Sequence, residues 1–303
     1  MRRDHRRGRG SRRRRGPGRG RGSSRRHGSV RGRAAARNQT TRRKNVFGGV
    51  IGLLALLILI ALFVRGQRGS RAFDAANCPE DGDYAAQIAI LVDPSDTLTT
   101  VQEGSGAPRV LEAIENGAPA TAEIRIYTVG QAGRGNTRAV FRVCKPVHPD
   151  DVDSFTGNPA LAERRYQEEF LAPLEKVLAE LLSVEGDSIS PIIKGIQVAA
   201  VSAFQPRDAD IPRQLLIVSD MIQNSRNLSF YREPVEFGPL SRNPDYGTLR
   251  VDLSGVEVSV FLLARRGGAG RIQGGTLRGF WEDYFLDQGA SPLARPRWIM
   301  VEG

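Results

Sequence analysis

Acidic side chains close two apolar runs in the second part of the chain. The run QIAILVD ends in Asp93, and the run QLLIVSD ends in Asp220. The hydroxyl side chains of Ser95 and Thr97 follow Asp93 at alternate positions, and Ser219 directly precedes Asp220. Carboxylate and hydroxyl oxygens are hard ligands, and Mg²⁺ binds them while it keeps several of its waters. These residues therefore predict a divalent-cation site, provided that the two runs end side by side.

The elements that would bring these residues together follow from the hydrophobic pattern. Apolar runs predict strands at 87–93, 122–129, 138–144, 214–220, 256–263 and 297–301. Helical spacing predicts helices at 108–116, from Asn158-Pro159 through Leu181, from Ser190-Pro191 to about 204, and at 277–288. This alternation predicts an α/β fold with a mostly parallel central sheet and helices on both faces. Ligands of such sheets bind beyond the carboxyl ends of the strands.

The sequence around Asp93 resembles the first motif of von Willebrand factor A-type (VWA) domains. In that family an apolar strand ends in D-x-S-x-S, and IAILVDPSDT supplies Asp93, Ser95 and Thr97, with Thr in place of the last Ser. The resemblance implies that Ser190, in DSISPIIKGIQVAA, stands for a family Thr that precedes a helix, with Ser188 as the next candidate.

The third element of the resemblance is an acid at the end of the fourth strand, which Asp220 matches. The resemblance extends in element order over most of residues 84–303 and implies one VWA-like domain there. In the family, such oxygens hold Mg²⁺ or another divalent cation, and a carboxylate from a protein partner completes the coordination. The resemblance therefore implies a docking or assembly module in the cell envelope, and not an enzyme.

Two other interpretations of the same residues stay open. Asp93, Ser95 and Asp220 could cap turns and helices without holding a cation, and the domain would then be a structural VWA-like subunit. ILVDPSDTLT is also similar to the first motif, D-x-D-x-T-L, of haloacid dehalogenase-type phosphatases. Ser95 replaces the second acid of that motif, and a serine cannot transfer a proton at neutral pH, so this alternative is the least favoured.

The two cysteines can be placed once the VWA-like fold is assumed. In such a sheet the third strand runs antiparallel at the edge, so Cys144 at its end would lie near the beginning of the first strand. Cys78 precedes that first strand by a few residues. The resemblance therefore implies a disulfide between Cys78 and Cys144, which an oxidising compartment permits.

Composition divides the chain into a basic tail and an acidic remainder. Residues 1–45 contain 18 Arg and Lys44 against one acid, Asp4, in a 303-residue chain of net charge +11. The remaining residues are mildly acidic, which argues against nucleic-acid binding by the domain.

His148 is the only histidine outside the tail. A His-rich zinc site or a Ser/His/Asp triad therefore has at most one candidate histidine in the domain.

An apolar segment at 46–64 predicts a membrane anchor. VFGGVIGLLALLILIALFV contains no charged residue and is long enough to span a bilayer as a helix. The excess of Arg before it predicts a cytoplasmic N-terminus. We expect a bacterial inner-membrane protein, with a linker at 65–83 and a periplasmic or extracellular domain at 84–303. We expect the tail at 1–45 to be disordered and to contact anionic lipids, with nucleic-acid binding as the less favoured alternative.

Two further segments carry weaker signals. GAGRIQG at 268–274 resembles a phosphate-binding loop, but its late position in the fold favours a flexible connector. The segment 226–246 follows Asp220 and is rich in prolines, aromatics and arginines. It is either a packed insertion or the rim that selects a partner.

Overall fold

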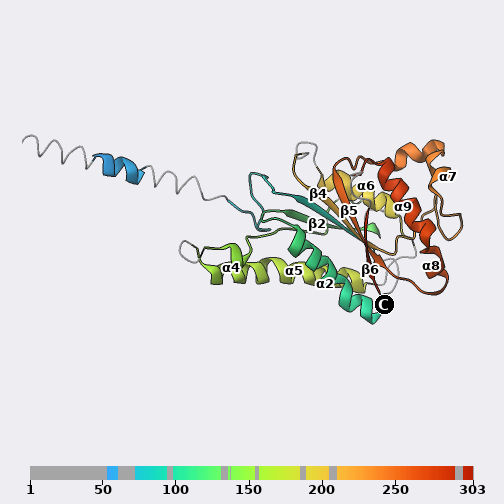
Figure 1. The fold of residues 1–303 in the computed structure, drawn as a ribbon, viewed down its shortest axis with the longest axis horizontal. Helices are drawn as coiled ribbons and strands as arrows, with labels where there is room; N and C mark the ends of the chain where they lie inside the picture. Colours follow the sequence, from blue (N-terminus) through green and yellow to red (C-terminus); the bar gives the residue numbers. More distant parts are fainter. Residues whose placement is uncertain are drawn as a thin grey trace, which may run out of the picture. The chain divides into compact units, whose positions relative to one another are not determined.

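The computed structural model describes residues 53–60, 72–93, 98–130, 136, 138–153, 157–184, 189–204, 210–290 and 296–302. The chain forms two compact units, Met1–Ser70 and Arg71–Gly303 (Figure 1). In the first unit, residues 53–60 are helical and their large hydrophobic side chains are exposed. The rest of the predicted span at 46–64 and the whole tail at 1–45 lie outside the described residues. Within the described residues, no helix is both long and apolar enough to cross a membrane.

A six-stranded sheet forms the centre of the second unit, in the order β3-β2-β1-β4-β5-β6. Its strands are β1 (Gln87–Val92), β2 (Glu123–Thr128), β3 (Phe141–Cys144), β4 (Arg213–Ser219), β5 (Val256–Leu263) and β6 (Arg297–Val301). All neighbouring strands run parallel except β3, which is antiparallel to β2 at one edge. The predicted α/β fold with a mostly parallel sheet is therefore confirmed.

Helices cover both faces of this sheet (Figure 1). The helices of the second unit are α2 (Thr100–Gly117), α4 (Pro159–Arg165), α5 (Ala172–Ser183), α6 (Ile192–Ala203), α7 (Phe237–Ser241), α8 (Gly267–Ile272) and α9 (Gly275–Asp287). Six residues in a π-helical turn, Tyr166–Leu171, join α4 to α5. The predicted long helix beginning at Asn158-Pro159 corresponds to α4, this turn and α5, with the Asn158 side chain capping the first turn.

Side chains of β1 explain why the sheet is covered on both sides. Ile88, Ile90 and Val92 point into a core shared with α2 and α5, whereas Ala89 and Leu91 point into a core shared with α6 and α9. The whole strand is buried, as its unbroken apolar sequence predicts for a central parallel strand. Burial of apolar surface on both faces stabilises the sheet and fixes the register in which β1 and β4 end together.

Two predicted elements differ from the structure. The helix predicted at 108–116 begins eight residues earlier, at Thr100, because Thr99 and Gln102 form a capping box. The predicted connector at 268–274 contains a short helix, α8, followed closely by α9. The glycines of this segment weaken the helical signal in the sequence but do not prevent a single helical turn.

A disulfide fastens the segment before β1 to the end of β3. Cys78 and Cys144 are bonded, both are fully buried, and they are separated by 66 residues in sequence. The backbone N–H of Cys144 donates to the carbonyl of Ala76, and Arg142 forms an ion pair with Asp74 at 2.7 Å. The predicted disulfide is confirmed.

Candidate functional site

The candidate site lies where β1 and β4 end side by side. The chain leaves β1 for α2 on one face of the sheet, whereas the elements after β4 and β5 pack on the other face. In open α/β sheets, a crevice forms at such a reversal of strand order, beyond the carboxyl ends of the strands. We call this region, with the loops that follow β4 and β5, the carboxyl edge.

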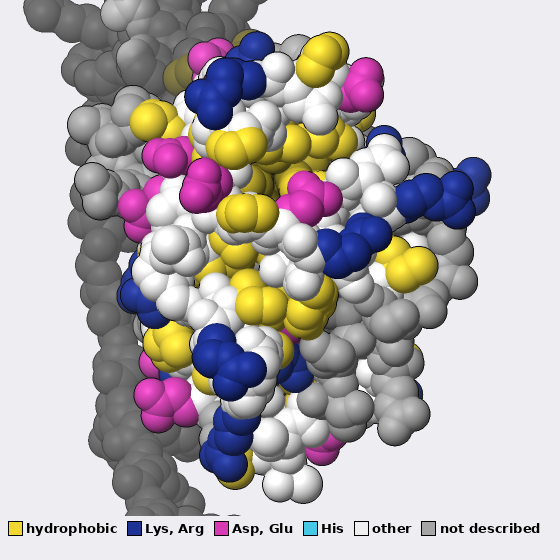
Figure 2. Space-filling model, turned by 90° about the vertical axis from the view of Figure 1, so that its right-hand side faces the viewer, with side chains coloured by type: hydrophobic (Ala, Val, Ile, Leu, Met, Phe, Trp, Pro, Cys, Tyr) yellow, Lys and Arg dark blue, Asp and Glu magenta, His cyan; other side chains and the backbone are white. Residues whose placement is uncertain are grey.

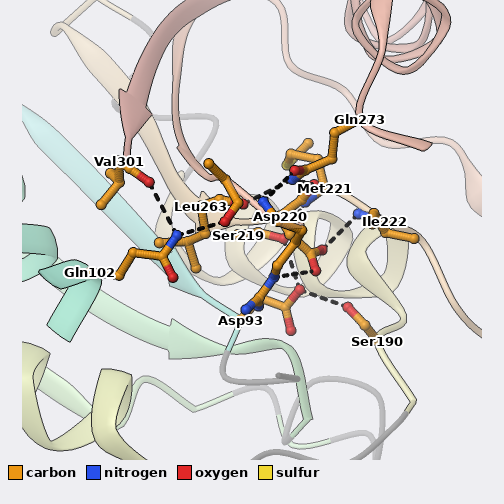
Figure 3. A network of polar contacts seen from close by, with 12 residues as sticks. Asp93, Gln102, Ser190, Ser219, Asp220, Met221, Ile222, Leu263, Gln273 and Val301 are labelled. Atoms are coloured by element: carbon orange, nitrogen blue, oxygen red, sulfur yellow. Dashed lines mark hydrogen bonds and ion pairs between the residues drawn. The ribbon is translucent and has the colours of Figure 1, made fainter. Parts of the chain in front are cut away.

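Asp93 lies at the base of this edge and is almost fully buried. Its Oδ2 atom accepts hydrogen bonds from the hydroxyls of Ser190, at 2.7 Å, and Ser219, at 2.8 Å (Figure 3). Both serines are also buried. Ser190 lies two residues before α6, and its backbone pairs with Asn224 of the loop after β4. Three separate chain segments therefore meet at one carboxylate. Hydrogen bonds to a charged acceptor compensate for part of the cost of burying it.

Asp220 forms a buried ion pair with an arginine from the loop after β5. Its Oδ2 atom lies 3.0 Å from Nε of Arg265, whose side chain is only 9% exposed. Its Oδ1 atom accepts the backbone N–H of Ile222 at 2.9 Å (Figure 3). Burial, followed by the negative charge of Asp93, raises the pKa of Asp220 to about 7, although Arg265 pulls it down. Burial and the charge of Asp93 therefore favour the protonated form of Asp220, and the ion pair with Arg265 opposes them.

Gln273, the residue that caps α8, holds Arg265 in place. Its side-chain oxygen accepts the backbone N–H of Arg265 at 2.6 Å, and its Nε2 donates to the carbonyls of Asp220 and Leu263, both at 2.9 Å. The same residue thus joins the end of β4 to the end of β5 (Figure 3). In α2, Gln102 plays a similar part, because its Nε2 donates to the carbonyls of Ala264 and Val301.

Met221 has an unusual backbone conformation next to Asp220. Its φ of 62° lies in the left-handed region, which costs about 1 kcal/mol or more for a residue other than glycine. Its N–H donates to the hydroxyl of Ser219, and its carbonyl accepts the indole N–H of Trp281, both at 2.8 Å. These two hydrogen bonds hold the backbone in a sharp turn at the residue after Asp220. Residues with such strained backbone cluster at functional sites.

The structure brings together three of the five residues predicted for the cation site. Asp93, Ser190 and Asp220 converge at the carboxyl edge. Ser95 and Thr97 belong to residues 94–97, which lie outside the described part of the chain. The sequence prediction missed Arg265 as the partner of Asp220. The available signal was its position two residues after β5, a strand that lies beside β4.

The donor set fits a divalent cation only in part. The hydroxyl oxygen of Ser190 and a carboxylate oxygen of Asp93 lie 2.7 Å apart, joined by a hydrogen bond. Both oxygens of Asp220 already accept a hydrogen bond, one from a backbone N–H and the other from a guanidinium, so a cation would compete with Arg265 for this carboxylate. A fixed positive charge in this position also repels a second cation. Among the described residues, no cluster of three or more His, Cys, Asp and Glu side chains could hold a metal.

Comparisons with known proteins add a loose structural likeness. No family model matches the chain. No curated protein matches it in sequence. Among solved structures, it is similar to an aerotolerance-related membrane protein from Bacteroides fragilis NCTC 9343, in a form with multiple mutations to serines, at 13% identity and a TM-score of 0.33. That match covers 71% of this chain and 90% of the other. A likeness at this level establishes neither family nor function.

Proposed function

We propose that the chain is a membrane-anchored, VWA-like docking module that binds a protein partner at the carboxyl edge of its sheet. The observation that supports this function best is the convergence of Asp93, Ser190, Ser219 and Asp220 at the point where the strand order reverses. Buried charges and hydroxyls are costly for stability alone, and folds of this kind place ligand contacts at this edge. The anchor is the apolar segment 46–64, which would hold the domain on the periplasmic or extracellular side.

The surface beside these residues suits a protein contact. Ile189 directly precedes Ser190 and is 57% exposed, and Tyr231, which follows Phe230 in the loop after β4, is 50% exposed. A short ladder joins the two places, since Ser190 pairs with Asn224 and Asn224 pairs with Ser229. Exposed apolar and aromatic side chains next to arginines are characteristic of protein interfaces.

Two forms of this docking are proposed, and they differ in whether a cation takes part. In the first form, Asp93, Ser95, Thr97 and Ser190 would hold Mg²⁺ or another divalent cation, and Mg²⁺ would supply an electrophile for a carboxylate of the partner. In the second form, the same edge docks a partner without a cation. The buried Asp220–Arg265 ion pair favours the second form, because one of the two acids already has an internal counter-ion.

An unfolding experiment separates the two forms. Both tryptophans of the chain, Trp281 and Trp298, lie in the domain, so tryptophan fluorescence of the full chain in detergent reports on this domain alone. If Mg²⁺ binds, it raises the unfolding midpoint relative to chelator, and the shift disappears in Asp93→Ala. If Mg²⁺ does not change the unfolding midpoint of the unmodified protein, the cation-dependent form is wrong. We do not propose an enzymatic role. If the protein hydrolysed a phosphate ester and Asp93→Asn abolished that activity, the phosphatase alternative would be favoured.

Site-specific photo-crosslinking in native membranes tests the docking function itself. A photo-reactive amino acid at Ile189 lies at the carboxyl edge. The matched control is Val147, which is 47% exposed and follows β3 at the opposite, amino-terminal pole of β1. We expect a protein adduct from position 189 and none from position 147. Equal adducts from both positions, or none from position 189, would contradict docking at this edge.

A further inference from the structure

A hollow lies between α2 and the first halves of the strands β4, β5 and β6. Its volume is about 610 Å³, which is within the range of small-ligand sites. The three strands form its floor, and the second half of α2 forms a wall. The first half of α2 is fastened over the far ends of β5 and β6, because Gln102 donates to the carbonyls of Ala264 and Val301, and Arg109 donates to the carbonyl of Met300. The hollow therefore opens toward the amino-terminal ends of the strands, away from the carboxyl edge.

The floor of the hollow is polar, although it belongs to a mostly parallel sheet. Parallel strands are normally buried on both faces. The first half of β5 instead alternates, and Glu257 is exposed and Ser259 is half-buried where they line the hollow. Phe261, further along the strand, is buried. This part of the sheet suits a polar ligand better than the apolar face of a partner helix.

Charged side chains of both signs surround the hollow. Arg109 and Glu112 stand one turn apart on the wall, and Glu257 and Arg297 lie on the floor. Arg297 pairs in register with the residue two places after Glu257, so these two side chains occupy the same face of neighbouring strands. Within the described part of the chain, the side chains of Glu112, Glu257 and Arg297 form no hydrogen bond or ion pair. Two acids and two arginines thus give the hollow no net charge, and three of the four groups are available to a ligand.

The face of the domain that carries α7 and α8 has a different character. In Figure 2, hydrophobic side chains run through the middle of this face, and acidic and basic side chains lie around them. Such a mixed surface is compatible with the protein contact proposed above. The hollow instead gathers polar groups around a concave space, so it suits a small ligand.

We propose that this hollow binds a small zwitterionic ligand, a free amino acid or a short peptide, with its ammonium group at the two glutamates and its carboxylate at Arg297. The site is independent of docking at the carboxyl edge, because it opens at the other end of the strands. A guanidinium binds a carboxylate with two parallel hydrogen bonds, and an ammonium group has three donors for carboxylate oxygens. A simple anion or cation would be repelled by one of the two kinds of charge, which favours a ligand that carries both.

Equilibrium dialysis of labelled trialanine against the full chain in nanodiscs of neutral lipid tests the proposal. We expect saturable binding, and a loss of about tenfold in affinity when the peptide is N-acetylated or when its carboxylate is amidated, because each change removes one set of charged hydrogen bonds. The basic tail also attracts a carboxylate, but that attraction does not need the ammonium group. Competition by free alanine shows whether one residue is enough: full competition identifies an amino-acid site, and none identifies a peptide site.

Charge variants of the hollow supply the matched comparison. Arg297→Glu should lower the affinity for trialanine about tenfold or more, whereas Arg164→Glu, an equal change of charge at an exposed position in α4, should leave it unchanged. Glu112→Arg combined with Arg297→Glu should regain affinity relative to Arg297→Glu alone, because the hollow again presents both signs. The tryptophan fluorescence midpoint of each variant checks that the domain is folded.

Four results would overturn the proposal. These are the absence of saturable trialanine binding, equal binding of the N-acetylated peptide, equal effects of Arg297→Glu and Arg164→Glu, and no regain in the charge-exchanged variant. None of them changes the adduct expected from position 189, so the docking function is tested separately.

Discussion

Replacing Arg265 with methionine should destabilise the domain in a pH-dependent way. Breaking a buried ion pair by removing one partner typically costs 3–5 kcal/mol. Asp220 can take up a proton when its partner is lost, so we expect the low end of that range, about 3 kcal/mol, near pH 8. At about pH 5 the raised pKa of about 7 leaves Asp220 mostly protonated in the folded domain. The loss there should shrink to about 1 kcal/mol, the value of a hydrogen bond.

The sign of this effect follows from proton linkage. The ordinary pKa of Asp220 is 3.8, and in the folded domain it is about 7. Over this window the folded state binds more protons than the unfolded state, so Asp220 lowers the free energy of unfolding as pH rises from about 4 to about 7. Above that window the ion pair with Arg265 limits the loss. Removing Arg265 should raise the pKa of Asp220 in the folded domain further, and the decline in stability should therefore extend to higher pH.

Urea unfolding of the full chain in detergent, followed by tryptophan fluorescence near pH 5 and near pH 8, measures both values. Arg250→Met is the matched control. Arg250 pairs with Asp287 at 3.4 Å, but its side chain is 57% exposed, so its loss should cost about 1 kcal/mol or less at either pH. An equal loss for Arg265→Met at both pH values, or a loss no larger than that of the control near pH 8, would refute the reasoning.

Three further predictions concern the supports of the site. Ser190→Ala should lower the free energy of unfolding by about 1–3 kcal/mol, since Asp93 loses a buried hydrogen bond; a change below a few tenths would show that the bond adds nothing. Reducing the Cys78–Cys144 disulfide should cost about 4 kcal/mol and slow the chain on a gel, whereas identical mobility with and without reductant would contradict the bond. Thr99→Ala should cost about 1 kcal/mol through loss of the cap on α2, and Thr99→Ser, as the comparison, should cost much less.

Much of the fold could be predicted because its central strands are buried on both sides. The runs of β1 and of most of β4 are continuous and apolar, whereas β5 alternates in its first half and is apolar in its second half. The alternation of these runs with helices predicts a parallel sheet. The start of α2 was harder to predict, since Gly104, Gly106 and Pro108 obscure the helical pattern. The capping box at Thr99 and Gln102 was the signal that mattered, because a local cap can outweigh weak helix formers.

The candidate site could be predicted as far as the strand ends fix it. Asp93 and Asp220 directly follow neighbouring strands, so their convergence follows from topology. The partner of Asp220 could not be predicted in the same way, because Arg265 is 45 residues further along the chain and is oriented by Gln273. An arginine that reaches the site only through tertiary packing gives no periodic signal in the sequence. Its charge nevertheless changes what Asp93 and Asp220 can bind.

Photo-crosslinking from position 189 in native membranes, repeated in chelator and in high salt, tests the central claim most directly. Docking at this edge without a bridging cation predicts one protein adduct that survives chelation. An adduct that disappears in chelator and withstands salt would instead indicate a metal-bridged contact. The absence of any adduct under all three conditions would contradict docking at this edge.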